Sequence, residues 1–348
     1  MMRRFSFAFA IVFFAGLTGI PCAQAAPTAE AERNSLQVAQ AAPTPTKKAD
    51  FPAKGKVITA ISPTTAGSGS DVSLRVLAEG LEKELGVSVE VVNKPGAGQQ
   101  TGITELLRAK PDGYTICNMT FPNVQLIYLD PERQAAFGRK NLQPVANYVS
   151  DVGLVAVRAN SPFKTMQDLV NAAKASPGKI KLSTTAILSP HHIAILKLQK
   201  MAGVKFAIAH FSGSAPGITA LLGGHIDGFF GFGADIMPQI KSGDVRVLGI
   251  SDTKENSFYP GVKTMEAQGY KLHFIAARLI AAPAGTPRPV VNILSEAVKR
   301  ALETDAVKKK MMNLGIEPYY MDPDKLSAYW TQVEADVKPF VEEARSEK

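Results

Sequence analysis

The sequence predicts an α/β protein in which parallel sheets carry helices on both faces. From Lys56 to the C-terminus, short β-rich segments alternate with amphipathic helical segments, and such alternation is typical of parallel sheets. Several predicted strands are nearly continuous apolar runs, as expected of strands buried on both faces. A chain of 348 residues can form two lobes of about 120–170 residues, each with its own core. We therefore expect two doubly wound α/β lobes separated by a cleft.

Strands are expected wherever β-branched and aromatic residues cluster between turn residues. These segments are 57–61, 87–92, 115–119, 152–158, 180–183, 206–210, 226–230, 245–250 and 274–281. The first helix has an apolar stripe from Leu74 to Leu85, with Ser70 as the expected N-cap and Gly86 ending it. Further helices are expected over 101–109, 166–175, 191–202, 216–222, 288–303, 305–313 and 323–344.

The order of these segments also predicts where the lobes begin and end. The chain would leave the first lobe near residue 150 and return to it near residue 275. The first lobe would then comprise 54–150 and 275–348, and the second 151–274. Residues 26–53 are rich in Ala, Pro, Thr and Gln without a sustained apolar period, which predicts a flexible tether.

The N-terminus has the pattern of a secretory signal peptide. Arg3 and Arg4 precede an uncharged apolar run over 5–20, and a small-residue cleavage motif ends at Ala25. An uncleaved membrane anchor is the alternative, but the run is short for a span of about 20 residues and ends at Pro21. We expect residues 1–25 to be removed and the mature protein to be periplasmic.

The composition is that of an ordinary globular protein, with 45% hydrophobic and 20% charged residues. The net charge of +8 does not indicate nucleic-acid binding, because basic and acidic residues are interleaved and no basic–aromatic stripe is present. Cleavage would leave Cys117 as the only cysteine, so no intrachain disulfide is possible. Its place in an apolar strand favours a buried, inert thiol over a nucleophile.

Three loops share one design: each follows a strand, is rich in small polar residues and leads into a helix. They span 63–71, 184–190 and 211–216. Helix N-termini expose unpaired N–H groups and a partial positive charge, so they favour anions. Each loop alone could be an ordinary turn whose hydroxyl caps a helix. Because open α/β sheets bind ligands at the carboxyl ends of their strands, three such loops facing one cleft predict a carboxylate site.

The enzymatic alternatives lack their sequence signatures. The chain has no Gly-x-Ser-x-Gly elbow, no phosphate-binding Gly-x-x-x-x-Gly-Lys-Ser/Thr loop and no His-Glu-x-x-His pair. Gly96, Gly98 and Gly102 only imitate a dinucleotide loop, and their spacing is wrong. His191 and His192 are adjacent, so on a helix they point about 100° apart and cannot chelate one metal. We expect no catalytic residue, no metal and no cofactor.

An ordered series of short motifs resembles a known family over nearly all of the chain from Lys56 onward. The motifs lie at 58–71 (ITAISPTTAGSGSD), 93–102, 111–116, 210–227 (HFSGSAPGITALLGGHID), 239–251, 260–270 and 282–291. In this order they resemble the substrate-binding proteins of tripartite tricarboxylate transporters, the TctC-like Bug family. The resemblance implies a type II periplasmic-binding fold with a hinged cleft that holds a carboxylate-bearing solute. It also implies a membrane permease as partner and no cofactor.

Several expected pocket positions depart from the family pattern. Thr64 replaces an aromatic residue, Ala186 to Leu188 replace a glycine-rich stretch, Gly231-Phe232 replaces an Asp-Asn pair, and Ala277 replaces a Trp beside Arg278. These changes remove polar partners for an amino group or a second carboxylate and add apolar surface. They predict an apolar or aromatic acid surrounded by Phe121, Ile187, Leu188 and Phe232, with Arg278 as a candidate for a second charge.

The candidate ligand-binding residues come from these loops and strand ends. They are Thr64, Thr65, Gly67, Ser68, Gly69, Ser70, Thr120, Phe121, Thr185, Ser189, Ser214 and Phe232. The function expected is that of a monomeric periplasmic receptor, which captures a small organic acid and delivers it to a tripartite-type permease. A ligand sensor for a membrane signalling protein would need the same closing motion and stays an alternative. An exported hydrolase is a more distant one.

Overall fold

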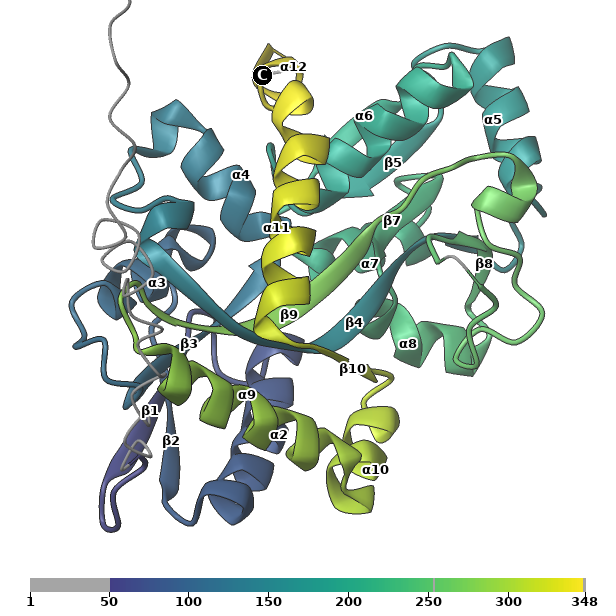
Figure 1. Ribbon diagram of the computed structural model, residues 1–348. Coiled ribbons are helices and arrows are strands. Elements are labelled where there is room, and N and C mark those ends of the chain that lie inside the picture. Colours follow the sequence, from purple (N-terminus) through teal and green to yellow (C-terminus); the bar gives the residue numbers. More distant parts are fainter. Residues whose placement is uncertain (1–50, 253, 347–348) are drawn as a thin grey trace, which may run out of the picture. The chain divides into compact units, whose positions relative to one another are not determined.

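A computed structural model of the protein describes residues 51–252 and 254–346 (Figure 1). The expected signal peptide, 1–25, and nearly all of the expected tether lie outside the described residues. Phe51, near the end of that tether, packs against Tyr114 with the ring centroids 5.0 Å apart. The backbone N–H of Ala53 also donates a hydrogen bond to the Tyr114 hydroxyl at 2.8 Å. The folded chain therefore includes these last residues of the expected tether.

The described chain alternates strands and helices, as the sequence predicts. The strands are β1 (Val57–Ser62), β2 (Ser88–Asn93), β3 (Thr115–Phe121), β4 (Leu142–Arg158), β5 (Lys181–Thr184), β6 (Ala207–His210), β7 (Gly228–Phe232), β8 (Val245–Ile250), β9 (Ile275–Pro283) and β10 (Glu317–Met321). The α-helices are α2 (Gly69–Leu85), α3 (Gln100–Leu106), α4 (Asn123–Leu129), α5 (Met166–Ala175), α6 (Pro190–Ala202), α7 (Ser214–Leu222), α8 (Gly233–Ser242), α9 (Arg288–Glu303), α10 (Asp305–Asn313), α11 (Pro323–Val337) and α12 (Val341–Ser346).

Some boundaries differ from the sequence-based expectation. Helix α2 begins at Gly69 and its N-cap is Ser68, which has extended backbone angles and accepts from the Asp71 N–H. Ser70, the expected cap, already lies inside the helix, so that expectation is wrong. Gly86 does end the helix, in the left-handed conformation at φ 67°.

Other elements were predicted only in part or were not predicted at all. The expected strand 152–158 is only the second half of β4, whose 17 residues include the buried polar Asn147 and Asp151. Helix α8 contains an internal proline, Pro238, which conceals its helical character. Helix α4 has only 7 residues and β10 has 5, too few for either to show a clear period.

The ten strands form one sheet in the order β2-β1-β3-β9-β4-β7-β5-β6, with β8 and β10 both pairing with β4. Strands β1, β2 and β3 are parallel to one another, and so are β5, β6 and β7. The antiparallel strands β9 and β4 lie between these two sets. Strand β4 therefore runs through both halves of the sheet.

Helices cover both faces of each half, which confirms the α/β class (Figure 1). In the half with β1–β3, α2 and α9 pack on one face, and α3, α4 and α11 on the other. Alternate residues of β3 separate these two cores, since Ile116 lies in the first and Met119 in the second. In the half with β5–β7, α5 and α6 cover one face, and α7 and α8 the other.

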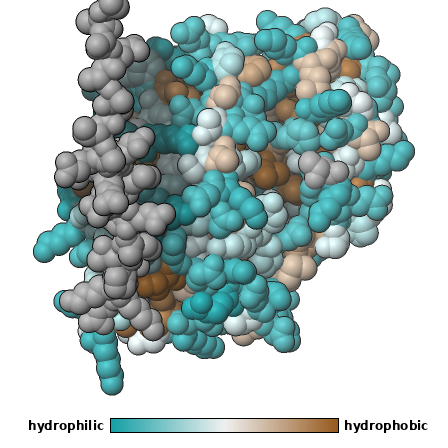
Figure 2. Space-filling model, viewed as in Figure 1, coloured by the Kyte–Doolittle hydropathy of each residue, from teal (hydrophilic) through white to brown (hydrophobic). Residues whose placement is uncertain are grey.

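None of the helices in residues 51–252 and 254–346 is long and apolar enough to cross a membrane. On the face seen in Figure 2, hydrophilic residues prevail and hydrophobic residues gather only in small separated patches. Scattered apolar residues of this kind are normal on the surface of a globular protein.

Candidate functional site

The carboxyl ends of the two parallel strand sets meet at the middle of β4. Strand β3 ends at Phe121, which pairs with Ala277 of β9. On its other side, Ala277 pairs with Ser150 of β4, so β3 ends level with Ser150. Strand β7 runs in the opposite direction and ends at Phe232, which pairs with Gly153 of β4. The two sets therefore point their carboxyl ends at each other within three residues of β4. We call this region, Ser150–Gly153 with the adjoining ends of β3 and β7, the strand junction.

The first predicted loop, between β1 and α2, is held by hydrogen bonds of its own side chains. Ser68 donates to the Thr64 hydroxyl at 2.9 Å, and the Asp71 carboxylate accepts from the Gly67 N–H at 2.9 Å. Burial raises the pKa of Asp71, but hydrogen bonds from Arg75, the Gly67 N–H and Asn93 outweigh this effect and hold the pKa below its usual value. The buried Asp71 is therefore a charged carboxylate, and in this form it holds the loop in place.

This loop leaves specific groups available to a solute. Thr65 and Gly67 are exposed, and a side chain at Gly67 would meet open space. The N–H groups of Gly69 and Ser70 open α2 and have no partner within the helix. The Ser70 hydroxyl accepts from Asn118 at 2.9 Å, so its own proton can still be donated. By contrast, Ser68 uses its hydroxyl to cap α2 and to hold Thr64.

A hydrogen-bonded network links α2 to the strand junction. Tyr148 of β4 donates to Asn118 at 3.1 Å and lies 3.2 Å from the Ser73 hydroxyl. The Arg278 guanidinium donates to the Gly69 carbonyl at 3.1 Å and to Ser73 at 3.3 Å. A Cβ placed on Gly69 would lie 3.6 Å from this guanidinium. Arg278 therefore lies directly against the first turn of α2.

Arg278 also forms a buried ion pair with Asp151, at 3.2 Å between Nη2 and Oδ2. The side chains are only 7% and 2% exposed. The other Asp151 oxygen accepts from the Ala234 N–H at 3.3 Å, at the start of α8. Helix α8 has no side-chain cap of its own, so Asp151 supplies an anion at its positive end. This pair connects the first turn of α2 to the first turn of α8.

The electrostatics of Asp151 are unusual for a carboxylate. Burial raises its pKa to about 7, while Arg278 lowers the pKa and Asp235 raises it. The Tyr259 hydroxyl is also close, because a Cβ on Gly233 would collide with it. Burial, followed by the charges of Asp151 and Asp235, raises the pKa of Tyr259, so this phenol stays protonated.

The third predicted loop joins this network through α7. Ser214, the first residue of α7, donates to the Asp235 carboxylate at 2.6 Å. Because its only proton points at Asp235, the Ser214 hydroxyl cannot also donate to a carboxylate. Ser214 can offer an anion its backbone N–H, which lies at an uncapped helix start.

The second predicted loop contacts the junction through an aromatic cluster. Ser189 caps α6, and Thr185 shares a 2.9 Å hydrogen bond with His191. The His191 ring lies 4.6 Å from that of Phe232, which stacks on Phe274 at 4.9 Å. Burial lowers the pKa of His191 to about 3, so the ring is neutral. Its Nε2 atom has no partner within the described residues.

Two of the residues predicted to contact the solute, Phe121 and Leu188, are buried in this structure. Phe121 is fully buried and packs edge-on against Trp330, with centroids 4.7 Å apart. Leu188 is buried in a cluster with Leu126 and Val337. Their roles around a solute stay predictions, and both side chains currently stabilise the core. Thr120, beside Phe121, accepts a hydrogen bond from Gln99 at 3.3 Å.

The site also includes residues that the sequence pattern did not predict: Gln99, Asn118, Asp151 and Asp235. A signal was present for Asp151, because a single carboxylate in the apolar run from Val149 to Val157 has to be paired when it is buried. The sequence does not show that Arg278 is the partner of Asp151, because nothing local indicates that β4 and β9 are neighbours.

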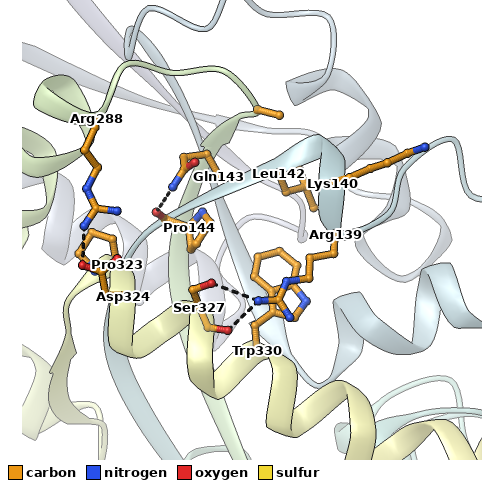
Figure 3. A pocket seen from close by; sticks show the side chains of 11 residues that line it. Arg139, Lys140, Leu142, Gln143, Pro144, Arg288, Pro323, Asp324, Ser327 and Trp330 are labelled. Carbon is orange, nitrogen blue, oxygen red and sulfur yellow. Dashed lines mark hydrogen bonds and ion pairs between the residues drawn. The ribbon is translucent and has the colours of Figure 1, made fainter. Parts of the chain in front are cut away.

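A pocket with a volume of about 500 Å³ lies away from the strand junction, near the start of β4 (Figure 3). Its polar groups are largely satisfied by one another. Arg139 donates to the Ser327 carbonyl at 2.8 Å, and Arg288 pairs with Asp324 at 2.6 Å. None of the predicted ligand-binding residues lines this pocket. We interpret its arginines as holding α11 in place.

Among the described residues, no group of three or more His, Cys, Asp or Glu side chains could hold a metal ion.

Comparison with known families identifies the class of protein. Residues 73–345 match the model of the tripartite tricarboxylate transporter family receptor, TctC. This chain belongs to that family. The TctC family is one of periplasmic solute-binding receptors, so by family this chain is a solute-binding protein.

Individual relatives agree with this assignment. Protein BugT of Bordetella pertussis is 30% identical over 275 residues, which cover 77% of this chain and 83% of BugT. A TctC solute-binding protein from Polaromonas has the same fold, with a TM-score of 0.73 at 24% identity over 84% of this chain and 99% of that one. An R. palustris protein solved with adipate gives a TM-score of 0.72 at 23% identity over 85% and 98%. These similarities confirm the type II periplasmic-binding fold.

Proposed function

We propose that this TctC-family receptor captures a small organic acid at the strand junction and delivers it to a tripartite-type membrane permease. The observation that carries the proposal is the meeting of the two parallel strand sets, which brings the N-termini of α2 and α8 to one place. Helix N-termini and hydroxyl groups bind anions without a dedicated lysine or arginine.

The same geometry supports a two-lobed receptor. The lobes would be 54–150 with 275–348, and 151–274, so that the chain crosses between them inside β4 and again near the start of β9. The crossing at residues 150–151 coincides with the strand junction. A rotation about these two strands would bring the loops of one lobe toward those of the other.

The carboxylate would bind at the start of α2. The N–H groups of Gly69 and Ser70, together with the hydroxyls of Thr65 and Ser70, provide donors there. The R. palustris protein solved with adipate has the same fold, and its ligand is a carboxylic acid. The acid class for this chain rests mainly on its own donors, because an identity of 23% supports only the fold.

The proposal also includes export of the protein to the periplasm. The N-terminal pattern of two arginines, an apolar run and Ala23-Gln24-Ala25 is that of a cleaved signal peptide. We propose that the mature receptor begins near Ala26 and works in the periplasm as a monomer.

The test is isothermal titration calorimetry with a panel of monocarboxylic and dicarboxylic acids and their neutral amides. We expect one acid to bind per chain and to be recovered unaltered. Thr65→Val and Ser70→Ala should each weaken binding about tenfold or more, because a hydrogen bond to a charged group contributes about 1.5–3 kcal/mol.

Ser242→Ala is the matched control, since the Ser242 hydroxyl pairs with Asp244 at the far end of α8. Its affinity should equal that of the wild type. Tight binding of the neutral amides alone would refute the carboxylate receptor, and chemical conversion of the acid would refute a receptor without catalysis.

A further inference from the structure

The strand junction and the side chains around it carry more negative than positive charge. Arg278 contributes a positive charge and pairs with Asp151, and Asp235 adds a second carboxylate that is close enough to raise the pKa of Asp151. The loops after β1, β3, β5 and β6 contain no lysine or arginine. The loop after β2 carries Lys94, but this residue lines a separate pocket with Glu105 and Arg108. His191 is neutral because burial lowers its pKa to about 3.

We propose that Asp151 is a specificity-determining residue that restricts this receptor to solutes with a single carboxylate. The inference rests on the proposed function and names its substrate class. Asp151 neutralises Arg278, which leaves the helix N-termini and neutral donors to hold one anionic group. Among residues 51–252 and 254–346, a second carboxylate on the same solute finds no uncompensated cation at the junction.

The hydrogen bonds of Arg278 explain why it does not serve a second carboxylate. Its Nη1 atom donates to Gly69 and Ser73 of α2, and its Nη2 atom to Asp151. A solute that recruited Arg278 would have to separate it from Asp151 and leave that carboxylate buried and unpaired. Breaking a buried pair in this way is costly, because the remaining charge is neither solvated nor compensated.

The groups around Asp151 make the site sensitive to added negative charge. Arg278 faces it from β9, the Ala234 N–H and Asp235 from α8, and Tyr259 from the segment after β8. Burial raises the pKa of Asp151 to about 7, with Arg278 opposing and Asp235 adding to this shift. The surroundings of the junction therefore already disfavour the charged form of Asp151. An additional carboxylate would be repelled in the same low-dielectric environment.

The experiment compares matched acids that differ only in a second carboxylate: hexanoate with adipate, and benzoate with terephthalate. In whichever of these two pairs binds to the wild type, calorimetry should show that the monocarboxylate binds at least about tenfold more tightly than the dicarboxylate. Asp151→Asn removes the negative charge, keeps an acceptor for the Ala234 N–H and leaves Arg278 unbalanced. We expect this variant to gain about tenfold in affinity for the dicarboxylate, which loss of folding could not mimic.

Three further variants control for charge and folding. Arg278→Gln combined with Asp151→Asn restores neutrality and should restore the preference of the wild type. Asp235→Asn removes an exposed carboxylate and should give a smaller gain for the dicarboxylate, even if Asp151→Asn folds poorly. Asp130→Asn removes a buried carboxylate that pairs with Arg133 and Arg345 in another part of the chain, and should not change the preference.

The outcomes separate the two proposals. Wild-type protein that binds adipate or terephthalate as tightly as its partner acid would overturn the single-carboxylate inference while leaving the carboxylate receptor intact. An unchanged preference in both Asp151→Asn and Asp235→Asn would overturn the role of Asp151. Binding of neutral compounds alone would refute the carboxylate receptor, and this inference with it.

Discussion

At the scale of single residues, Asp151 and Arg278 distinguish this receptor from one that uses only neutral groups. Each comes from an apolar strand, and each is buried against the other. Buried charges of this kind add little net stability, because the desolvation of both groups offsets their attraction. A role in recognition explains their presence better than a role in stability does.

The raised pKa of Asp151 predicts a pH dependence of stability. Its pKa lies at about 7 in the folded protein, above the ordinary value of 3.8, so the folded state holds this proton more tightly than the unfolded state. The contribution of Asp151 is therefore fully present at low pH and is lost as the pH rises from about 4 to about 7. Urea denaturation between pH 5 and 8 should show this loss in the wild type and a flatter profile in Asp151→Asn. Parallel profiles for the two proteins would contradict the assignment.

The sequence indicated where the loop residues lie better than it indicated their hydrogen-bond partners. Gly69 and Ser70 lie at the first turn of α2, near the buried Arg278, and Thr65 lies in the loop before this helix. The direction of a hydroxyl proton is not encoded locally, however. Ser214 donates to Asp235 and Ser68 to Thr64, and both partners are evident only from the folded chain. Phe121 likewise looks like a pocket residue until Trp330 is placed against it by a distant helix.

At the scale of elements, α2 is the helix on which the proposed site depends. Ser68→Ala should destabilise the protein by about 1 kcal/mol, because it removes the cap of this helix. Ser70→Ala keeps that cap and loses the hydroxyl that accepts from Asn118. Thermal and urea denaturation should therefore give a larger loss for Ser68→Ala, whereas calorimetry with the bound acid should give a larger loss for Ser70→Ala. The reverse order in denaturation would mean that Ser70 is the functional cap, as the sequence alone suggested.

The elements with a clear hydrophobic period were predicted almost to the residue, including α5, α9 and α10. Strand β4 was only half predicted, because Pro144, Asn147 and Asp151 interrupt its apolar pattern. Tertiary partners compensate for these interruptions. Asn147 donates to the Tyr319 carbonyl at 2.7 Å, and Asp151 pairs with Arg278. The part of β4 that the sequence did not predict includes Ser150 and Asp151 of the junction.

At the scale of the whole molecule, the alternation of strands and helices was sufficient to predict the α/β class. It did not reveal that β9 returns between β3 and β4, although this return creates the junction. Strand order depends on contacts between segments more than a hundred residues apart, as for Phe121 and Ala277. The ordered motifs indicated the family and its fold by resemblance. The match over residues 73–345 confirmed the family, and the similar solved structures confirmed the fold.

The central claim is that an organic acid binds at the strand junction, between the first turn of α2 and the start of α8. The most direct measurement is a crystal structure of the protein with the acid that binds most tightly in calorimetry. The account predicts one acid per chain, with its carboxylate within hydrogen-bond distance of the Gly69 or Ser70 N–H. Arg278 should remain paired with Asp151. An acid bound instead in the pocket beside Arg139 and Trp330, with the junction unchanged, would contradict the account.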